Sequence, residues 1–282
     1  MTQFSNKKSL GQNFLTDESI AKKIVESANI SKTDNVLEIG PGKGILTEYL
    51  AGSNARILAI EIDQRLIESL KKNFENIEII EGDILKINIP ELIEENNFQN
   101  YKVVANLPYY ITSKIIRLFL ETKYPPSEMI FMVQKEVGER IVAQDEKESI
   151  LSISVKFYAD PEILFEVPRE NFEPVPKVDS VVIKIKRKNK IPDVDIKKFF
   201  SLVKAGFSAK RKMLNNNLIN LGYSKTELLE ILKKAGLEPT VRAEKLKVKD
   251  WVKLHDMIQS AYEIYVAVGN HSCFLSVINN DT

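Results

Sequence analysis

The residues Asn106-Leu107-Pro108-Tyr109 combine groups that suit a reaction at the exocyclic amine of a nucleobase. The lone pair of such an amine is delocalised into the ring, and acceptors aimed at its hydrogens favour the pyramidal nitrogen of a transition state. The Asn106 side-chain oxygen and the Leu107 carbonyl oxygen can accept, and Pro108 fixes the turn without a competing N–H group. Tyr109 offers a flat face for the base. These four are candidate catalytic residues, although alone they could form an ordinary turn.

A fifth candidate catalytic residue, Phe172, begins a stretch that contains Pro174 and Pro176. Two prolines at this spacing forbid a helix and hold the chain extended. Phe172 could then cover the face of a base that Tyr109 leaves open, and the alternative is an aromatic residue of the core. Tyr110, beside Tyr109, is expected to serve only packing.

A glycine-rich loop supplies the second half of the predicted site. It reads Glu38-x-Gly40-x-Gly42-x-Gly44 between an apolar run and an amphipathic helix pattern, which is where backbone N–H groups meet a ligand. A dinucleotide fingerprint would need glycine at position 45, where Ile45 stands. The loop instead resembles the nucleoside-binding loop of Rossmann-like S-adenosylmethionine (SAM) methyltransferases. Methyl transfer from SAM is an in-line displacement that depends mainly on positioning.

Two acids stand at the ends of later predicted strands. Glu61 follows the strand at 56–60 and lies 21 residues past Gly40, where a ribose-binding acid belongs. Asp83 follows the strand at 77–80 and can accept a hydrogen bond from the adenine amine of a cofactor. Asp63 is expected to cap a helix over 64–73. The alternative for Glu61 is a surface acid at a strand end.

The alternation of these elements predicts an α/β fold with a largely parallel sheet, whose carboxyl edge collects the candidate residues. Further strands are predicted at 101–105 and 128–133, and the stretches 149–158 and 178–185 alternate like antiparallel strands. From Asp195 onward the pattern is helical. We expect a methyltransferase domain with an N-terminal arm over 1–189, a small all-helical domain over 190–265 and an unassigned tail over 266–282.

Charge is distributed unevenly along the 282 residues. Residues 181–260 hold 19 Lys and Arg against 8 Asp and Glu, whereas the remainder holds 21 against 31. The basic part predicts a face that meets nucleic-acid phosphates, and the alternative is a solvated lysine-rich surface.

Other classes of protein are disfavoured. Cys273 is the only cysteine, which excludes an intrachain disulfide and a Cys-rich zinc site and fits a reducing, cytoplasmic location. His255 and His271 have no ligand cluster around them, so we expect no metal. We also expect no signal peptide and no membrane partner, because no apolar run is long enough.

Five motifs together resemble the small-subunit (16S) ribosomal RNA adenine N6,N6-dimethyltransferase family, the dimethyladenosine transferases. The resemblance runs from about Lys7 to about Tyr262. The motifs are Leu-Gly-Gln-Asn-Phe-Leu (10–15), Glu-Ile-Gly-Pro-Gly-Lys-Gly (38–44), Asn-Leu-Pro-Tyr (106–109), Asn-Phe-x-Pro-x-Pro-Lys-Val-Asp-Ser (171–180) and Phe-Ser-Ala-Lys-Arg-Lys-Met-Leu-x-Asn-x-Leu (207–218). The run Ala-Lys-Arg-Lys departs slightly from the usual Gln-Arg-Arg-Lys of the family.

The resemblance implies a Rossmann-like class I fold and SAM as methyl donor. The residues that it places at the cofactor are Asn13, Leu15, Gly40, Glu61, Asp83 and Asn106, to which the loop pattern adds Gly42. It implies that Lys204, Lys210, Arg211 and Lys212 grip rRNA phosphates. It further implies that a monomer dimethylates two adjacent adenosines in a hairpin near the 3′ end of 16S rRNA, within the immature small subunit.

Three alternatives remain open. The sister family methylates an adenine of 23S rRNA and confers macrolide resistance, and it shares the fold and the cofactor loop. A ribosome assembly factor could keep the fold without catalysis. A DNA or small-molecule adenine methyltransferase is a third alternative, which the basic helical domain disfavours.

Overall fold

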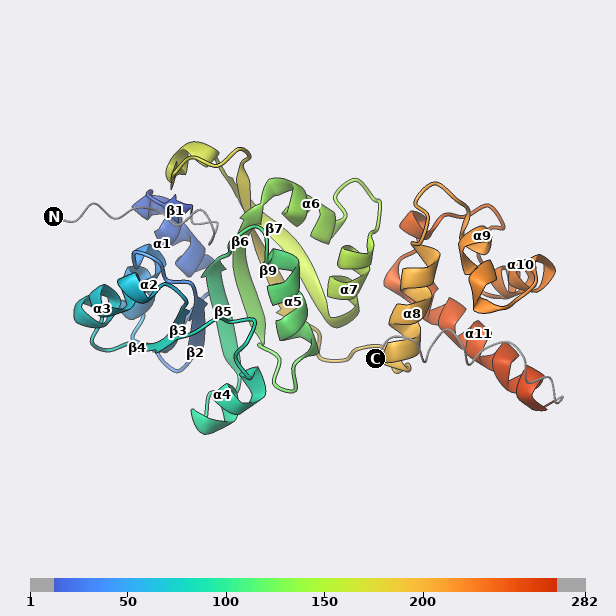
Figure 1. Ribbon diagram of the computed structural model, residues 1–282, viewed down its shortest axis with the longest axis horizontal. Helices are drawn as coiled ribbons and strands as arrows, with labels where there is room; N and C mark the ends of the chain where they lie inside the picture. Colours follow the sequence, from blue (N-terminus) through green and yellow to red (C-terminus); the bar gives the residue numbers. More distant parts are fainter. Residues whose placement is uncertain (1–12, 268–282) are drawn as a thin grey trace. The chain divides into compact units, whose positions relative to one another are not determined.

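The structure is a computed structural model that describes residues 13–267 (Figure 1). Residues 10–12 of the N-terminal motif, and the tail from residue 268, lie outside the described residues. The chain divides into two compact units. One contains the chain up to Val142 together with Tyr158–Lys188, and the other contains Ala143–Phe157 together with the chain from Asn189.

The first unit is built on a seven-stranded sheet of order β4-β3-β2-β5-β6-β9-β7. Neighbouring strands from β4 to β6 run parallel, whereas β9 is antiparallel to both β6 and β7. A separate pair joins the arm strand β1 (Phe14–Leu15) to β8 (Phe172–Glu173). The strands of the large sheet are β2 (Asn35–Ile39), β3 (Arg56–Glu61), β4 (Glu78–Glu81), β5 (Tyr101–Asn106), β6 (Glu128–Gln134), β7 (Ala159–Val167) and β9 (Ser180–Arg187).

Helices cover this sheet, and three of them begin at a side-chain cap. Asp17, Asp63 and Asn88 accept backbone N–H groups at the starts of α1, α3 and α4. The apolar faces of α1, α2 and α3 join one core cluster with strand residues such as Val36 and Ile57. The helices of this unit are α1 (Glu18–Ser27), α2 (Ile45–Ala51), α3 (Gln64–Asn73), α4 (Ile89–Glu95), α5 (Thr112–Glu121) and α6 (Lys135–Val142), with a 3-10 turn, η2, at Arg169–Asn171.

The strand order reverses between β2 and β5. From β2 the chain moves outward through β3 to β4, and it then returns to place β5 on the other side of β2. In open α/β sheets, ligands bind outside the carboxyl ends of the strands at such a reversal. The glycine loop follows β2 and the Asn106–Tyr109 turn follows β5, so the fold brings both predicted motifs to this point.

The second unit is helical and has its own core. Phe157 packs against Phe199 with ring centroids 4.7 Å apart, and Phe207 stacks on Trp251 at 5.8 Å. Its helices are α8 (Ile196–Gly206), α9 (Leu214–Leu218), α10 (Lys225–Lys234), α11 (Val248–Ala267) and most of α7 (Ile150–Tyr158), with 3-10 turns η3 at Ile219–Leu221 and η4 at Ala243–Lys245.

The prediction for 149–158 was wrong, because this stretch forms helix α7. The Ser149 hydroxyl accepts the backbone N–H of Ser152 at 3.1 Å, and the Ser149 N–H donates to the Ser152 hydroxyl at 2.7 Å, so the two serines start the helix. Ile153, Val155 and Phe157 are all buried, and a helix buried on several sides mimics strand alternation. Residues 143–157 belong to the helical unit, whereas the sequence analysis placed them in the methyltransferase domain.

Candidate active site

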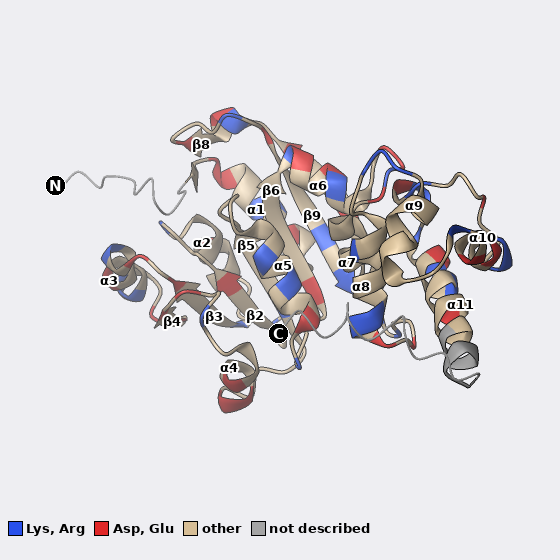
Figure 2. Ribbon diagram, turned by 45° about the vertical axis from the view of Figure 1, so that its right-hand side comes forward, with Lys and Arg blue, Asp and Glu red and all other residues tan. Residues whose placement is uncertain are grey.

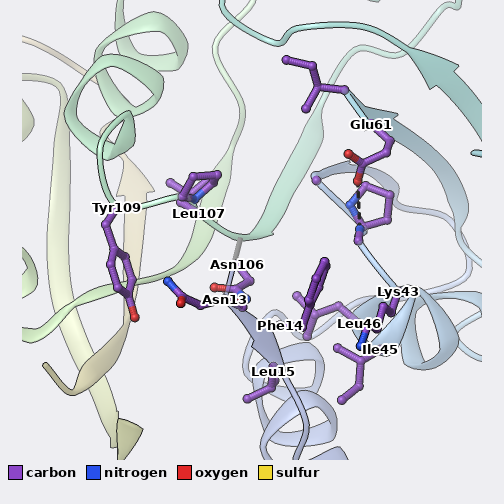
Figure 3. Close-up of a pocket in the computed structure, with 15 residues that line it drawn as sticks. Asn13, Phe14, Leu15, Lys43, Ile45, Leu46, Glu61, Asn106, Leu107 and Tyr109 are labelled. Carbon is purple, nitrogen blue, oxygen red and sulfur yellow. Dashed lines mark hydrogen bonds between the residues drawn. The ribbon is translucent and has the colours of Figure 1, made fainter. Parts of the chain in front are cut away.

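A cavity opens at the carboxyl edge where the strand order reverses, and it collects most of the predicted site residues. Glu61 and Tyr109 lie on opposite sides of it, with Asn106 and Asn13 between them (Figure 3). The predicted residues that line it are Asn13, Leu15, Gly40, Gly42, Glu61, Asn106, Leu107, Pro108 and Tyr109. The cavity therefore brings the candidate cofactor residues beside the candidate catalytic residues.

Glu61 is a buried acid held by the glycine loop. One carboxylate oxygen accepts the Gly42 N–H at 2.9 Å, the other accepts the Asp63 N–H at 2.8 Å, and the side chain is 3 % exposed. Burial raises the pKa of this carboxyl, and the backbone N–H groups oppose the shift. Gly42 has φ +62°, and a Cβ there would lie 3.0 Å from the Phe14 ring, so glycine is required. The loop and the acid thus form one preorganised unit.

Glu38 lies at the end of β2, just before the loop, and is almost completely buried. Its carboxyl is 1 % exposed, and within the described residues neither oxygen has a hydrogen-bond partner. Burial, reinforced by the Glu61 carboxylate, raises the pKa of Glu38 to about 8. The polar Thr47 hydroxyl lowers this pKa but does not offset the effect of burial. Glu38 is therefore protonated at neutral pH.

The N-terminal arm closes one side of the cavity. The Asn106 Nδ2 group donates to the Asn13 carbonyl oxygen at 3.2 Å. With Nδ2 engaged by the arm, Oδ1 is the atom of Asn106 that can accept from a ligand. Phe14 lies under the Lys43 ammonium, whose nitrogen is 4.9 Å from the ring centroid. The arm is itself held by β8, since Phe14 pairs with Glu173 and Leu15 with Phe172.

Tyr109 is fixed from the opposite side. Its hydroxyl shares a hydrogen bond of 2.8 Å with the hydroxyl of Ser180, the first residue of β9, which is fully buried. Burial raises the pKa of Tyr109, so the phenol is neutral and its ring is held in one orientation. The Leu107 N–H donates to Met132 of β6 at 3.2 Å, which fixes the turn that carries the predicted acceptors.

Two predicted site residues do not line the cavity. Phe172 is 2 % exposed and belongs to the core cluster, the position that the alternative interpretation expects. Asp83 follows β4, where its carboxylate accepts the Leu85 N–H at 3.0 Å and lies 3.9 Å from Lys86. The predicted contacts of these two residues with a base and with the cofactor remain predictions.

Other residues line the cavity although sequence reasoning did not select them. Ile62 follows Glu61 directly and is 47 % exposed, which is unusual for isoleucine. Its position directly after the acid that ends a strand could have indicated that it lines the cavity. Phe14, Pro41 and Lys43 also line it and lie within the motifs at 10–15 and 38–44, where they were not singled out. Ile45 and Leu46 complete the lining at the start of α2.

The predicted RNA-binding residues lie in the helical unit. Lys204 is in the last turn of α8, and Lys210, Arg211 and Lys212 belong to the basic loop (residues 207–213) that links α8 to α9. All four are exposed, and none forms an ion pair within the part of the chain that the structure describes. The buried Asn217 side chain donates to the carbonyl oxygens of Gly206 and Ala209 at 2.6 and 3.1 Å, and so fixes the start of the loop.

Two further findings bear on function. Among residues 13–267, no cluster of three His, Cys, Asp or Glu side chains could hold a metal ion. Over the same residues, no helix is long and apolar enough to cross a membrane.

The fold and the cavity define a class I, Rossmann-like methyltransferase. The family model described as "Ribosomal RNA adenine dimethylase" matches residues 3–260, and the chain belongs to this family. Proteins named "Ribosomal RNA small subunit methyltransferase A" are similar to it. The one from Streptococcus sanguinis is 44 % identical over 91 % of this chain and 93 % of its own length. The one from Fusobacterium nucleatum is 44 % identical over 89 % and 97 %.

Two solved structures extend the comparison. A dimethyladenosine transferase from Plasmodium falciparum is 29 % identical with a TM-score of 0.74, over 86 % of this chain and 95 % of that chain. The 23S rRNA methyltransferase ErmE is 26 % identical with a TM-score of 0.72, over 88 % and 100 %. The predictions of the family and of the fold class are confirmed.

Proposed function

We propose that this protein transfers methyl groups from SAM to the N6 amines of two adjacent adenosines in a hairpin near the 3′ end of 16S rRNA. The observation that carries the proposal is the cavity in which the Glu61–glycine loop unit faces the Asn106–Tyr109 turn. Membership of the rRNA adenine dimethylase family supports it, as do relatives at 44 % identity that are named for the small subunit.

The cavity residues fit SAM. The carboxylate of Glu61 suits ribose hydroxyls, the backbone of Gly40 and Gly42 allows close approach, and Leu15 and Ile62 supply apolar surface for a nucleoside. Asn13 and Asn106 add polar groups at the end of the cavity near Tyr109. When bound, SAM supplies an electrophilic methyl group.

The chain contributes orientation and two acceptors. The Asn106 Oδ1 atom and the Leu107 carbonyl oxygen accept the two N6 hydrogens of adenine, which favours a pyramidal nitrogen. The nitrogen bonds to the methyl carbon as the methyl–sulfur bond of the donor breaks, and the nitrogen then releases one proton to solvent. After one transfer it therefore keeps a single hydrogen, so one acceptor suffices for the second. Tyr109, held by Ser180, stacks the base throughout. No metal takes part in this scheme.

The substrate is recognised partly by charge. Lys204 and the cations of the basic loop neutralise rRNA phosphates, which predicts binding that weakens as salt rises. We further propose that the protein acts as a monomer in the cytoplasm, on 16S rRNA within the immature small subunit.

The test is methyl transfer from radiolabelled SAM into small subunits from an undermethylated strain, with large subunits alongside. Label in small-subunit RNA supports the proposal, whereas label only in large-subunit RNA would indicate 23S rRNA methylation, the activity named for the ErmE structure. The variant Asn106→Ala separates enzyme from assembly factor. It should abolish transfer, whereas a purely assembly-related role would survive it.

A further inference from the structure

The exposed apolar side chains of the first unit lie at or near one edge of its sheet, and Ile62 among them lines the cavity. Among the described residues of this unit, four large hydrophobic side chains are exposed, and they are Ile62 (47 %), Tyr110 (61 %), Val175 (60 %) and Val178 (43 %). Ile62 follows β3 and Tyr110 follows β5. Val175 and Val178 precede Ser180, which pairs with Gln134 at the end of β6. Ile62, Tyr110 and Val178 therefore lie at the carboxyl edge of the parallel strands, the edge at which the cavity opens, and Val175 is in the loop that leads to this edge.

Tyr110 and its neighbour Tyr109 differ in exposure and in contacts. Tyr109 lines the cavity and is bonded to Ser180, whereas Tyr110 is mostly exposed and makes no hydrogen bond or ring contact within residues 13–267. The expectation that Tyr110 serves packing is therefore wrong. The Tyr109–Ser180 bond also brings the segment of Tyr110 close to that of Val178, which is two residues before Ser180.

Cations are interleaved with these apolar side chains. Lys43 lines the cavity, Lys177 lies between Val175 and Val178, and Lys114 is in the first turn of α5; all three are exposed. Figure 2 shows basic residues along α5. An aromatic face with apolar side chains and separate cations suits the bases and phosphates of single-stranded RNA.

We propose that Tyr110, together with Val175 and Val178, forms a second base-binding surface that stacks the nucleotide next to the target adenosine. This inference rests on the proposed function. When one adenosine occupies the cavity beside Tyr109, the adjacent adenosine is the next nucleotide of the RNA. Tyr110 is likewise the next residue of the protein after Tyr109. Stacking there holds the unpaired strand in register and presents the two adenosines in turn.

The test compares wild type, Tyr110→Ala and Tyr110→Phe in binding to undermethylated small subunits over a series of salt concentrations. Tyr110→Ala should weaken binding roughly tenfold, the loss typical of one stacked base, and Tyr110→Phe should bind like wild type. Because tyrosine is uncharged, the plot of the logarithm of the binding constant against the logarithm of salt concentration should have the same slope for Tyr110→Ala as for wild type. Lys177→Ala should instead lower that slope by about 0.7, as expected for one phosphate contact on a single strand. SAM affinity, measured by calorimetry, should be unchanged in all variants.

Two results would overturn the inference, and both leave the proposed function intact. In one, Tyr110→Ala binds the subunits as tightly as wild type. In the other, Tyr110→Phe binds as weakly as Tyr110→Ala, which would assign the effect to the hydroxyl rather than to the ring. Failure of the proposed function looks different, because wild type itself would then neither bind nor methylate small subunits, and both proposals would fall.

Discussion

We predict that Glu38→Gln removes a strong pH dependence from the stability of the first unit. The buried carboxyl of Glu38 has its pKa raised from the ordinary 4.5 to about 8, while the unfolded chain titrates at the ordinary value. Between these values the folded protein keeps a proton that the unfolded protein loses. The stability from this group is therefore fully present below pH 4.5 and is lost as pH rises through 8.

The magnitude follows from the size of the shift. A pKa difference of 3.5 between the two states corresponds to about 5 kcal/mol of unfolding free energy across the whole range. About 4 kcal/mol of this falls between roughly pH 5 and pH 8. Glutamine has nearly the same shape as the protonated acid and does not ionise, so the variant should keep the fold and lose this dependence.

The assay is urea unfolding of cofactor-free protein at several values between pH 5 and pH 8. Because the single tryptophan, Trp251, reports on the helical unit, the first unit should be followed by amide hydrogen exchange of its sheet. Glu68→Gln, at an exposed position of α3, is the matched control and should follow wild type. If Glu38→Gln and wild type differ by the same amount at every pH, the reasoning about Glu38 is wrong.

Three further predictions concern named contacts. Ser180→Ala leaves the Tyr109 hydroxyl without its partner and should lower kcat several-fold, for a loss of about 1 kcal/mol, while SAM affinity stays unchanged; equal kinetics would contradict this. Asn217→Ala frees the basic loop and should weaken small-subunit binding without changing SAM affinity, as binding assays can check. Gly206→Ala places a Cβ against Trp251 and should destabilise the helical unit by about 1–3 kcal/mol, measured by tryptophan fluorescence.

Local patterns predicted most of the parallel sheet. The helix at Gln64–Asn73 with its Asp63 cap is confirmed, and the strands near 101–105 and 128–133 lie where expected. After α6, the antiparallel strand predicted at 178–185 is confirmed as β9, whereas α7 and β7 were not predicted. Strand β7 contains Pro161, which argues against a strand except at an edge, and β7 is an edge strand of the sheet.

The candidate site was predictable where a single residue or short motif has functional groups suited to the reaction or to the cofactor. The acid after β3 and the turn after β5 are examples, because parallel strands bring their ends together. The arm was not predictable from local pattern, because its place depends on pairing between Leu15 and Phe172, far apart in the chain. That pairing also explains why Phe172 is buried, which no pattern within its own loop indicates.

The central claim is that Tyr109 and its neighbours present adenosines of 16S rRNA to SAM for two transfers each. The most direct measurement is nucleoside analysis by mass spectrometry of small-subunit RNA after incubation with SAM and either wild type or Tyr109→Ala. Wild type should produce N6,N6-dimethyladenosine at two adjacent positions, and the variant should bind SAM normally but form little product. Full dimethylation by Tyr109→Ala, or wild-type product confined to large-subunit RNA, would contradict the claim.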